Sequence, residues 1–125
     1  MELGFPKSAR LLRRAEFLAI QHKGKGFSEG PLAASWSLRE AEPTRPGMRP
    51  GLARVGLTVS SKVGGAAVRN LVKRRLREAV RHELSTLPAV DLVIVARASS
   101  VNVRVADFRA WLRRAAERMV KGAGR

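Results

Sequence analysis

The densest group of side chains that could do chemistry lies in the segment AAVRNLVKRRLREAVRHEL, from Ala66 to Leu84. At 100° per residue its apolar side chains fall on one side of a helix and its basic side chains spread over the other. Asn70 lies within this basic arc, whose cations are Arg69, Lys73, Arg74, Arg77 and Arg81. About three helical turns extend roughly 18 Å, which matches several phosphates of a nucleic-acid backbone.

A basic helix face can also serve solubility alone. Solvated faces usually mix charges of both signs, whereas only Glu78 and Glu83 add negative charge near this one. Arginine predominates, and its planar guanidinium can bind phosphate through two hydrogen bonds. Phosphate binding is therefore the favoured interpretation. Arg75 is the exception, because it projects to the flank of the apolar side, where it can snorkel or pair with a carboxylate.

The composition of the whole chain agrees with an anionic partner. Its 125 residues carry 25 Lys and Arg against 10 Asp and Glu, a net charge of +15. Such an excess repels itself in a compact domain, and nucleic acid is the first partner to expect. The length fits one domain, residues 1–125, and 45% hydrophobic residues can build its core. Since no apolar run approaches the roughly 20 residues of a membrane span and no secretory signal is present, we expect a cytoplasmic protein.

The residues of a protein catalyst are not grouped in this sequence. Hydrolysis of phosphodiesters by bound metal needs clustered carboxylates, but the ten acids are dispersed. The two histidines, His22 and His82, are far apart, and the chain has no cysteine. We therefore predict no catalytic residue and no metal site in the protein itself.

The elements that position the basic helix are read from periodicity. A helix is predicted over residues 13–22, ended by Gly24 and Gly26. Strands are predicted over 32–38, over 53–60 and, with both faces covered, over 91–97. A last helix is predicted over 102–121, and its apolar positions are Phe108, Trp111, Leu112, Ala115 and Met119. Residues 1–12 form a basic, extended arm, and residues 40–51 form a Pro/Gly-rich loop.

We predict an α/β fold, an α+β sandwich of about four strands and three helices in the order αβββαβα, in which periodicity locates three of the strands. In the first strand, Leu32, Ala34, Trp36 and Leu38 point one way, and Trp36 is read as core. In the second, Val55, Leu57 and Val59 form the apolar face. The opposite face carries Gly56, Thr58 and Ser60, which lack bulk. A single nucleic-acid strand could lie there, but a plain solvent face fits the pattern equally well.

Three blocks of the sequence resemble the protein subunit of bacterial ribonuclease P. They are RVGLTVSSKVGGAAVRNLVKRRLRE, FPKSARLLRRAEFLAIQHKGKGFSEGPL and DLVIVARAS, and the resemblance covers about residues 5–120. It implies a ribonucleoprotein endonuclease that removes the 5′ leader from precursor tRNA. Its catalyst would be a partner RNA that binds most of the Mg²⁺, with no obligatory protein partner. It also implies a left-handed βαβ crossover, where a right-handed one is usual.

The resemblance implies two RNA-facing surfaces. The basic helix would face the catalytic RNA through Arg69, Asn70, Lys73, Arg74, Arg77 and Arg81. A cleft formed by the sheet and the first helix would hold the leader through Phe17, Ser35, Thr58, Ser60, Lys62 and Arg97. The protein would thereby bind the leader, support metal affinity and stabilise the RNA fold.

Three positions depart from the family pattern. Leu71 stands where a second arginine is usual, Gln21 where a second cleft aromatic is common, and Ser35 where a tyrosine can occur. Base stacking is worth roughly 1–3 kcal/mol per base, so leader binding would depend more on cations and backbone contacts here. The alternative function is another small basic RNA-binding protein of the ribosomal type.

Overall fold

A computed structural model of the chain describes residues 10–11, 14–38 and 53–123. Its helices and strands are α1 (Arg14–Lys23), β1 (Lys25–Glu29), β2 (Leu32–Leu38), β3 (Arg54–Val59), α2 (Ala66–Glu83), β4 (Val90–Ala96) and α3 (Val105–Ala123). Short 3-10 helices are η2 (Ser61–Val63), η3 (Leu84–Thr86) and η4 (Ala98–Asn102). The predicted αβββαβα order is confirmed. The predicted loop 40–51 lies outside the described residues, as does the predicted arm 1–12 except for Arg10 and Leu11.

The strands form one mixed sheet in the order β1-β2-β4-β3. β2 pairs antiparallel with β1 and with β4, whereas β3 pairs parallel with β4. Because α2 connects the parallel neighbours β3 and β4, these three elements form the predicted βαβ crossover, whose hand stays a prediction. β3 is thus an edge strand of the sheet.

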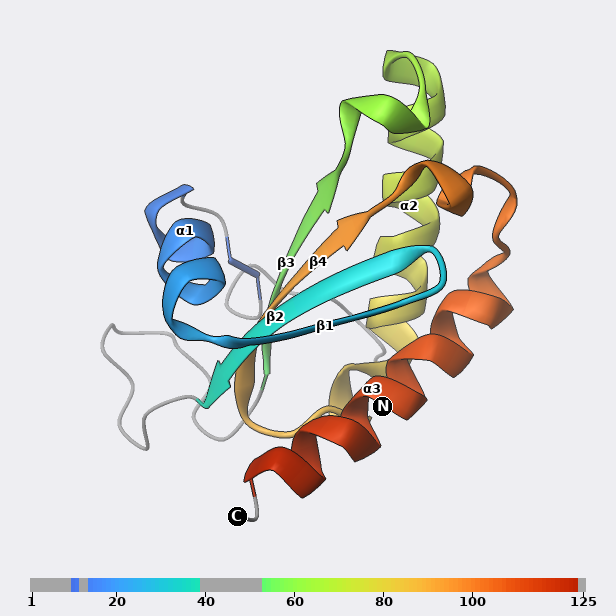
Figure 1. The fold of residues 1–125 in the computed structure, drawn as a ribbon. Coiled ribbons are helices and arrows are strands. Elements are labelled where there is room, and N and C mark those ends of the chain that lie inside the picture. Colours follow the sequence, from blue (N-terminus) through green and yellow to red (C-terminus); the bar gives the residue numbers. More distant parts are fainter. Residues whose placement is uncertain (1–9, 12–13, 39–52, 124–125) are drawn as a thin grey trace.

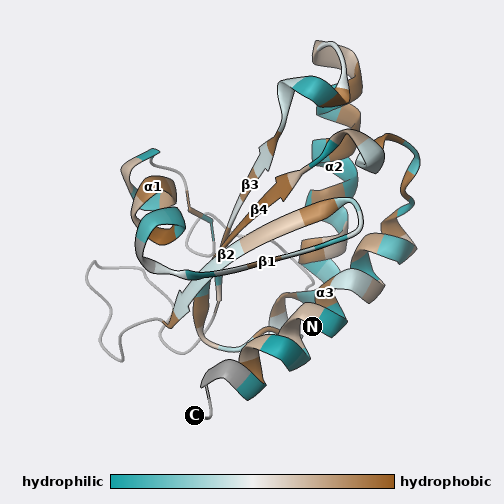
Figure 2. Ribbon diagram, in the orientation of Figure 1, coloured by the Kyte–Doolittle hydropathy of each residue, from teal (hydrophilic) through white to brown (hydrophobic). Residues whose placement is uncertain are grey.

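The sheet lies between two layers of helix, with α1 on one face and α2 and α3 on the other (Figure 1). The larger core fills the space under α2 and α3, where Leu76, Phe108 and Trp111 are buried. A smaller core of Leu11, Ile20 and Val93 lies under α1. The central strand β4 is therefore covered on both faces, as predicted, and Figure 2 shows it as a hydrophobic strand. None of the described helices is long and apolar enough to cross a membrane.

β1 is the strand that periodicity did not locate. Gly26, predicted to help end the first helix, lies inside it, because the helix already ends at Lys23. The strand KGFSE has one partly buried residue, Phe27, which stacks on Trp111 with ring centroids 5.8 Å apart. Its extended form depends on pairing with β2 through a turn at Gly30, whose φ of 59° favours glycine.

Two leucines predicted on apolar faces are exposed. Leu38 is 58% exposed, since it is the last residue of β2 and extends past the core. Leu71 is 39% exposed, because at 100° per residue it lies at the border of the apolar arc of α2. The other predicted core positions, Trp36 among them, are buried or partly buried.

A buried acid joins α2 to α3. The carboxylate of Glu83 accepts a hydrogen bond from Arg109 Nε at 2.8 Å and two from Arg113 at 3.1 Å, while its side chain is only 3% exposed. Burial is the largest influence and raises the pKa of Glu83, but the hydrogen bonds and charges of Arg113 and Arg109 together outweigh it and leave this pKa below its ordinary value. A group with a depressed pKa stabilises the fold above its unfolded pKa, and this stabilisation is lost as the pH falls through the folded value.

We expect Glu83→Gln to lower the free energy of unfolding by about 2 kcal/mol at neutral pH, because a buried pair loses its charge. The deficit should shrink as the pH falls below about 4.5, where the natural carboxyl also becomes protonated. Urea unfolding at a series of pH values measures both effects. Glu117→Gln, an exposed acid on α3, is the control and should change little. A deficit that stays constant down to pH 2 would contradict the ion-pair role.

Candidate nucleic-acid interface

The outward face of α2 carries cations that form no ion pair with any described residue. Arg74 and Arg77 are exposed and Lys73 is partly exposed, and none of the three forms an ion pair within the described part of the chain. Asn70 is exposed beside them, and Arg69 is partly buried with its Nε atom lacking a hydrogen bond among the described residues. Like charges gathered in this way repel one another, so the arrangement favours binding of an anion.

Arg81 differs from the other five predicted positions on this helix. It forms an ion pair with Glu78, which also lies 3.1 Å from His82 Nε2. The hydrogen bond from Arg81 is the main cause that lowers the pKa of Glu78, so the carboxylate stays charged and holds Arg81. Arg81 therefore reaches RNA only if it shares or releases this partner.

Arg75 has a structural role. Its guanidinium donates a hydrogen bond to the carbonyl of Val101 at 3.0 Å and a longer one to that of Val103 at 3.5 Å. It thereby fixes the turn η4 against α2. The flanking position predicted from the sequence is right, but the partners are carbonyl groups, and Arg75 does not replace the cation that Leu71 removes.

The arginines along the middle of α3 contrast with those of α2. Arg109 and Arg113 bind Glu83, and Arg114 lies 3.3 Å from a carboxylate oxygen of Glu29. Arg118 lies over the ring of Phe27 at 4.8 Å. The charges of this helix are thus largely used within the fold, and α2 offers the better anion-binding surface.

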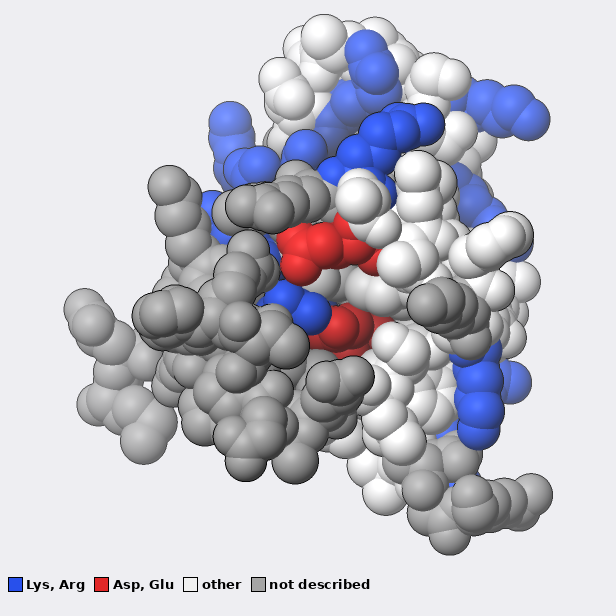
Figure 3. Space-filling view, turned by 90° about the vertical axis from the view of Figure 1, so that its left-hand side faces the viewer, with Lys and Arg blue, Asp and Glu red and all other residues white. Residues whose placement is uncertain are grey.

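α1 is held on the sheet by a three-way ion pair. Arg54 of β3 binds both carboxylate oxygens of Asp91 of β4 at 2.7 Å and reaches Glu16 of α1 at 3.2 Å. On the side of the molecule that α1 occupies, the visible acidic side chains form two neighbouring patches with a basic side chain beside and between them (Figure 3). The consequence is a fixed position for the next residue of α1, Phe17.

Phe17 lies directly over Gly56 of β3. A Cβ atom built at Gly56 would come within 2.5 Å of the Phe17 ring, so only glycine leaves room for it. The ring also packs on the small core under α1, but it stays partly exposed. The smooth face predicted for β3 is therefore partly covered by Phe17, and Thr58 remains its exposed residue.

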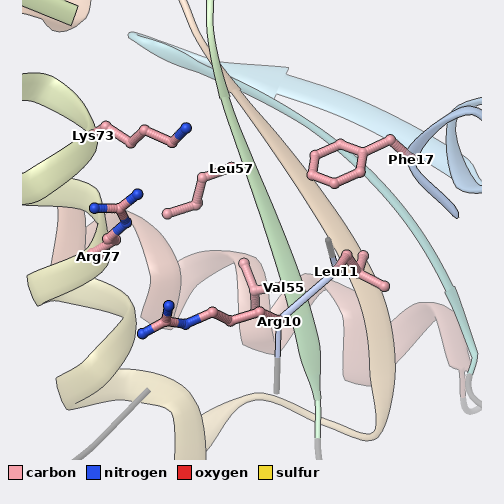
Figure 4. Close-up of a pocket in the computed structure, with 7 residues that line it drawn as sticks. All are labelled: Arg10, Leu11, Phe17, Val55, Leu57, Lys73 and Arg77. Carbon is pink, nitrogen blue, oxygen red and sulfur yellow. The ribbon is translucent and has the colours of Figure 1, made fainter. Parts of the chain in front are cut away.

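Phe17 lines two neighbouring pockets. The first, at the edge of β3, is also lined by Arg10, Leu11, Val55, Leu57, Lys73 and Arg77 (Figure 4). Figure 4 shows Lys73 and Arg77 reaching from α2 toward β3, with the guanidinium of Arg10 directed toward the same space. The second pocket is lined by Arg14, Phe17, Leu18, Gln21 and Thr58. Since they share Phe17, the two pockets form one path from α1 across β3 to α2.

The remaining predicted cleft residues are divided between two places. Ser60, Lys62 and Arg97 follow the carboxyl ends of β3 and β4, where Ser60 N–H donates to the Ala96 carbonyl. Ser60 Oγ accepts a hydrogen bond from the Lys62 amide and so stabilises the turn η2, while Lys62 and Arg97 are exposed. Ser35 of β2 pairs with Gly26 of β1 and lines neither of the two pockets.

Sequence reasoning missed Arg10, Arg14 and Leu18 as lining residues. Arg10 forms a parallel bridge with Val55, and the Leu11 amide donates to the Val55 carbonyl at 3.0 Å, which places Arg10 beside the β3 edge. No local sequence pattern predicts such a long-range pairing. Arg14 and Leu18, however, lie one turn from Phe17 and Gln21 on the same helix face, a spacing visible in the sequence.

No group of three or more His, Asp or Glu side chains within the described ranges is placed to hold a metal ion. His82 is engaged with Glu78. The arrangement offers cations, an aromatic ring and small polar groups, which together can bind a nucleic acid strand.

Comparison with known proteins gives one family. A model of the family described as Ribonuclease P matches residues 5–120. The ribonuclease P protein component of Gluconacetobacter diazotrophicus is 37% identical over 119 residues, 90% of this chain and 95% of that protein. That of Citrifermentans bemidjiense is 44% identical over 93 residues, 74% of this chain and 72% of that protein. The solved RNase P protein from Thermotoga maritima has a TM-score of 0.70 at 26% identity and covers 87% of this chain and 96% of its own.

Proposed function

Because the chain belongs to the ribonuclease P protein family, and is thus the protein subunit of this tRNA-processing ribonucleoprotein, we propose that it acts as an auxiliary subunit and leaves catalysis to its RNA partner. The observation that carries this proposal is the path around Phe17, which joins cations of α2 that form no ion pair among the described residues to a groove beside α1. Its role would be to hold RNA, in the cytoplasm. The ribosomal-type alternative is not favoured by the family match.

The state of the acidic residues supports an auxiliary role. Arginines engage Glu16, Glu29, Glu78, Glu83 and Asp91. A carboxylate bound by arginine is poorly suited to hold Mg²⁺, since its lone pairs and charge are already used. The Mg²⁺ of the reaction would therefore be bound mainly by the RNA partner, and the protein would raise metal affinity indirectly by stabilising the folded RNA.

We assign the RNA-binding residues of the basic helix to two different RNA molecules. Asn70 and Arg74 are exposed and line neither pocket, so they suit the catalytic RNA, with Arg69 at their side. Lys73 and Arg77 line the same pocket as Phe17, so their charges are placed to bind phosphates of the precursor tRNA leader. Lys62 and Arg97 would continue the leader path at the carboxyl ends of β3 and β4.

The cleavage assay compares protein alone, the cognate RNA subunit alone and both together, on precursor tRNA at low Mg²⁺. We expect no cleavage by the protein alone, slow cleavage by the RNA alone and strong stimulation by the pair. Cleavage by the protein alone would contradict the auxiliary role. If the protein left the activity of the RNA subunit unchanged, this result would contradict the protein's membership of this ribonucleoprotein. It would favour the ribosomal-type alternative.

A further inference from the structure

α1 is held on the sheet by little apolar packing. Ile20 is the one buried side chain among the described residues of this helix, and it lies in the small core with Leu11 and Val93. The helices on the opposite face, α2 and α3, cover the much larger core. Specific contacts near the two ends of α1 therefore decide how the helix lies on the sheet.

The C-terminal end of α1 is fixed by the backbone at Gly24. The Gly24 amide donates a hydrogen bond to the Ile20 carbonyl at 2.8 Å. A Cβ atom built at Gly24 would come within 2.4 Å of the carbonyl oxygen of Trp36, so the chain passes directly against β2 where the helix ends. This contact leaves the other end of α1 to be fixed by side chains.

Glu16 connects the N-terminal half of α1 to the sheet. Its Oε2 atom accepts a hydrogen bond from Arg54 Nη1 at 3.2 Å, and the two side chains are only 22% and 13% exposed. Arg54 is held separately by Asp91, whose two carboxylate oxygens each accept a hydrogen bond at 2.7 Å. The hydrogen bond with Asp91 is the largest cause that raises the pKa of Arg54, and Glu16 contributes less. Loss of Glu16 would therefore leave Arg54 on the sheet but remove its link to α1.

The residue that follows Glu16 is Phe17, whose ring lies over Gly56 and lines both pockets of the leader path. Glu16 itself lines neither pocket. We propose that Glu16 is a positioning residue for leader binding: through Arg54 it sets the distance between Phe17 and β3 without touching RNA. This inference rests on the proposed binding of the leader beside Phe17.

The sign of the effect of Glu16→Gln separates positioning from electrostatics. The variant removes a negative charge, so by charge alone it should strengthen binding of every RNA. Positioning predicts a loss for one ligand only. In the complex with the cognate RNA subunit, affinity for precursor tRNA should fall about 5-fold, as part of a stacking contact is lost, while affinity for mature tRNA stays nearly unchanged. Filter binding of both tRNAs at one salt concentration measures this difference.

Arg54→Lys tests the same link with no change of net charge. A single ammonium group replaces the planar fork, so it cannot bind both Asp91 oxygens and Glu16 as arginine does. We expect the same selective loss of precursor affinity, and this variant decides the question if Glu16→Gln does not fold. Glu29→Gln is the matched control, because it breaks another ion pair between a carboxylate and an arginine, the one with Arg114. It should leave the ratio of precursor to mature affinity unchanged.

Combination with Phe17→Ala shows whether Glu16 acts through the ring. The double variant Glu16→Gln/Phe17→Ala should bind precursor tRNA no more weakly than Phe17→Ala alone. Thermal unfolding of each variant checks that the fold is kept. The inference is overturned if Glu16→Gln strengthens binding of both tRNAs, weakens both equally in a folded protein, or adds its full loss to that of Phe17→Ala. A selective loss in Phe17→Ala would in each of these cases still support the proposed leader binding.

Discussion

Replacement of both Arg69 and Arg74 by glutamate is expected to weaken binding of the catalytic RNA by about 100-fold or more, because each lost charge-assisted contact is worth roughly 1.5–3 kcal/mol. Arg74 is exposed and Arg69 is partly exposed on α2, and neither has an ion pair in the described part of the chain, so their replacement removes no ion pair of the fold. The slope of log K against log salt should also decrease by roughly 1 for each phosphate contact removed. Filter binding of the cognate RNA at several salt concentrations measures both quantities.

The matched control places the same charge change on the other exposed helix. Arg104 lies directly before α3 and Lys121 in its last turn, both are exposed, and reversing both to glutamate changes the net charge equally. We expect only a small loss of affinity and a nearly unchanged salt slope. If the α3 variant weakened binding as much as the α2 variant, the effect would come from net charge, and the α2 face would lose its role as a specific RNA-binding surface.

The position of this basic face could be predicted because it depends on local periodicity. A helix repeats every 3.6 residues, so the sequence alone separates Val72 and Leu76 from Arg74 and Arg77. The structure buries the first two and exposes the other two. The helical period also placed Leu71 on the apolar side, where the structure leaves it 39% exposed. Periodicity orders positions around a helix but does not tell how wide the buried contact is.

Local sequence patterns could not predict that the basic face of α2 and the cleft beside α1 adjoin each other. Arg10, Phe17, Leu57 and Lys73 are far apart in the chain and meet only because β3 is the edge strand and α2 returns beside it. Periodicity predicts strands but not their order in a sheet. The family resemblance implies that Lys73 and Arg77 face the catalytic RNA, whereas in the structure both line the same pocket as Phe17.

The close approach of Phe17 to Gly56 shows the same dependence on tertiary structure. From the sequence, Gly56 is one of several small residues that make a strand face smooth. In the structure it is the residue that admits the aromatic ring, since a Cβ atom there would overlap Phe17. The glycine and the aromatic therefore form one unit, and this leads to a prediction for both.

Phe17→Ala is expected to weaken binding of precursor tRNA about 10-fold while binding of mature tRNA is nearly unchanged, because a stacked leader base is worth roughly 1–3 kcal/mol. Gly56→Ala should cause a similar selective loss, since the new methyl group displaces the ring from β3. Gly26→Ala in β1 is the control: its Cβ would meet only the Ala34 carbonyl oxygen at 3.5 Å and Ser35 Oγ at 4.0 Å, which are ordinary contacts.

The double variant Phe17→Ala/Gly56→Ala separates a binding role from a packing role. Once the ring is absent, the methyl group at position 56 has nothing to displace, so the double variant should bind precursor tRNA no more weakly than Phe17→Ala alone, a coupling that a double-mutant cycle detects. Thermal unfolding of each variant checks that the fold is kept. If Phe17→Ala weakened precursor and mature tRNA equally in a folded protein, Phe17 would be a core residue only, and the leader path would have to be sought elsewhere on the sheet.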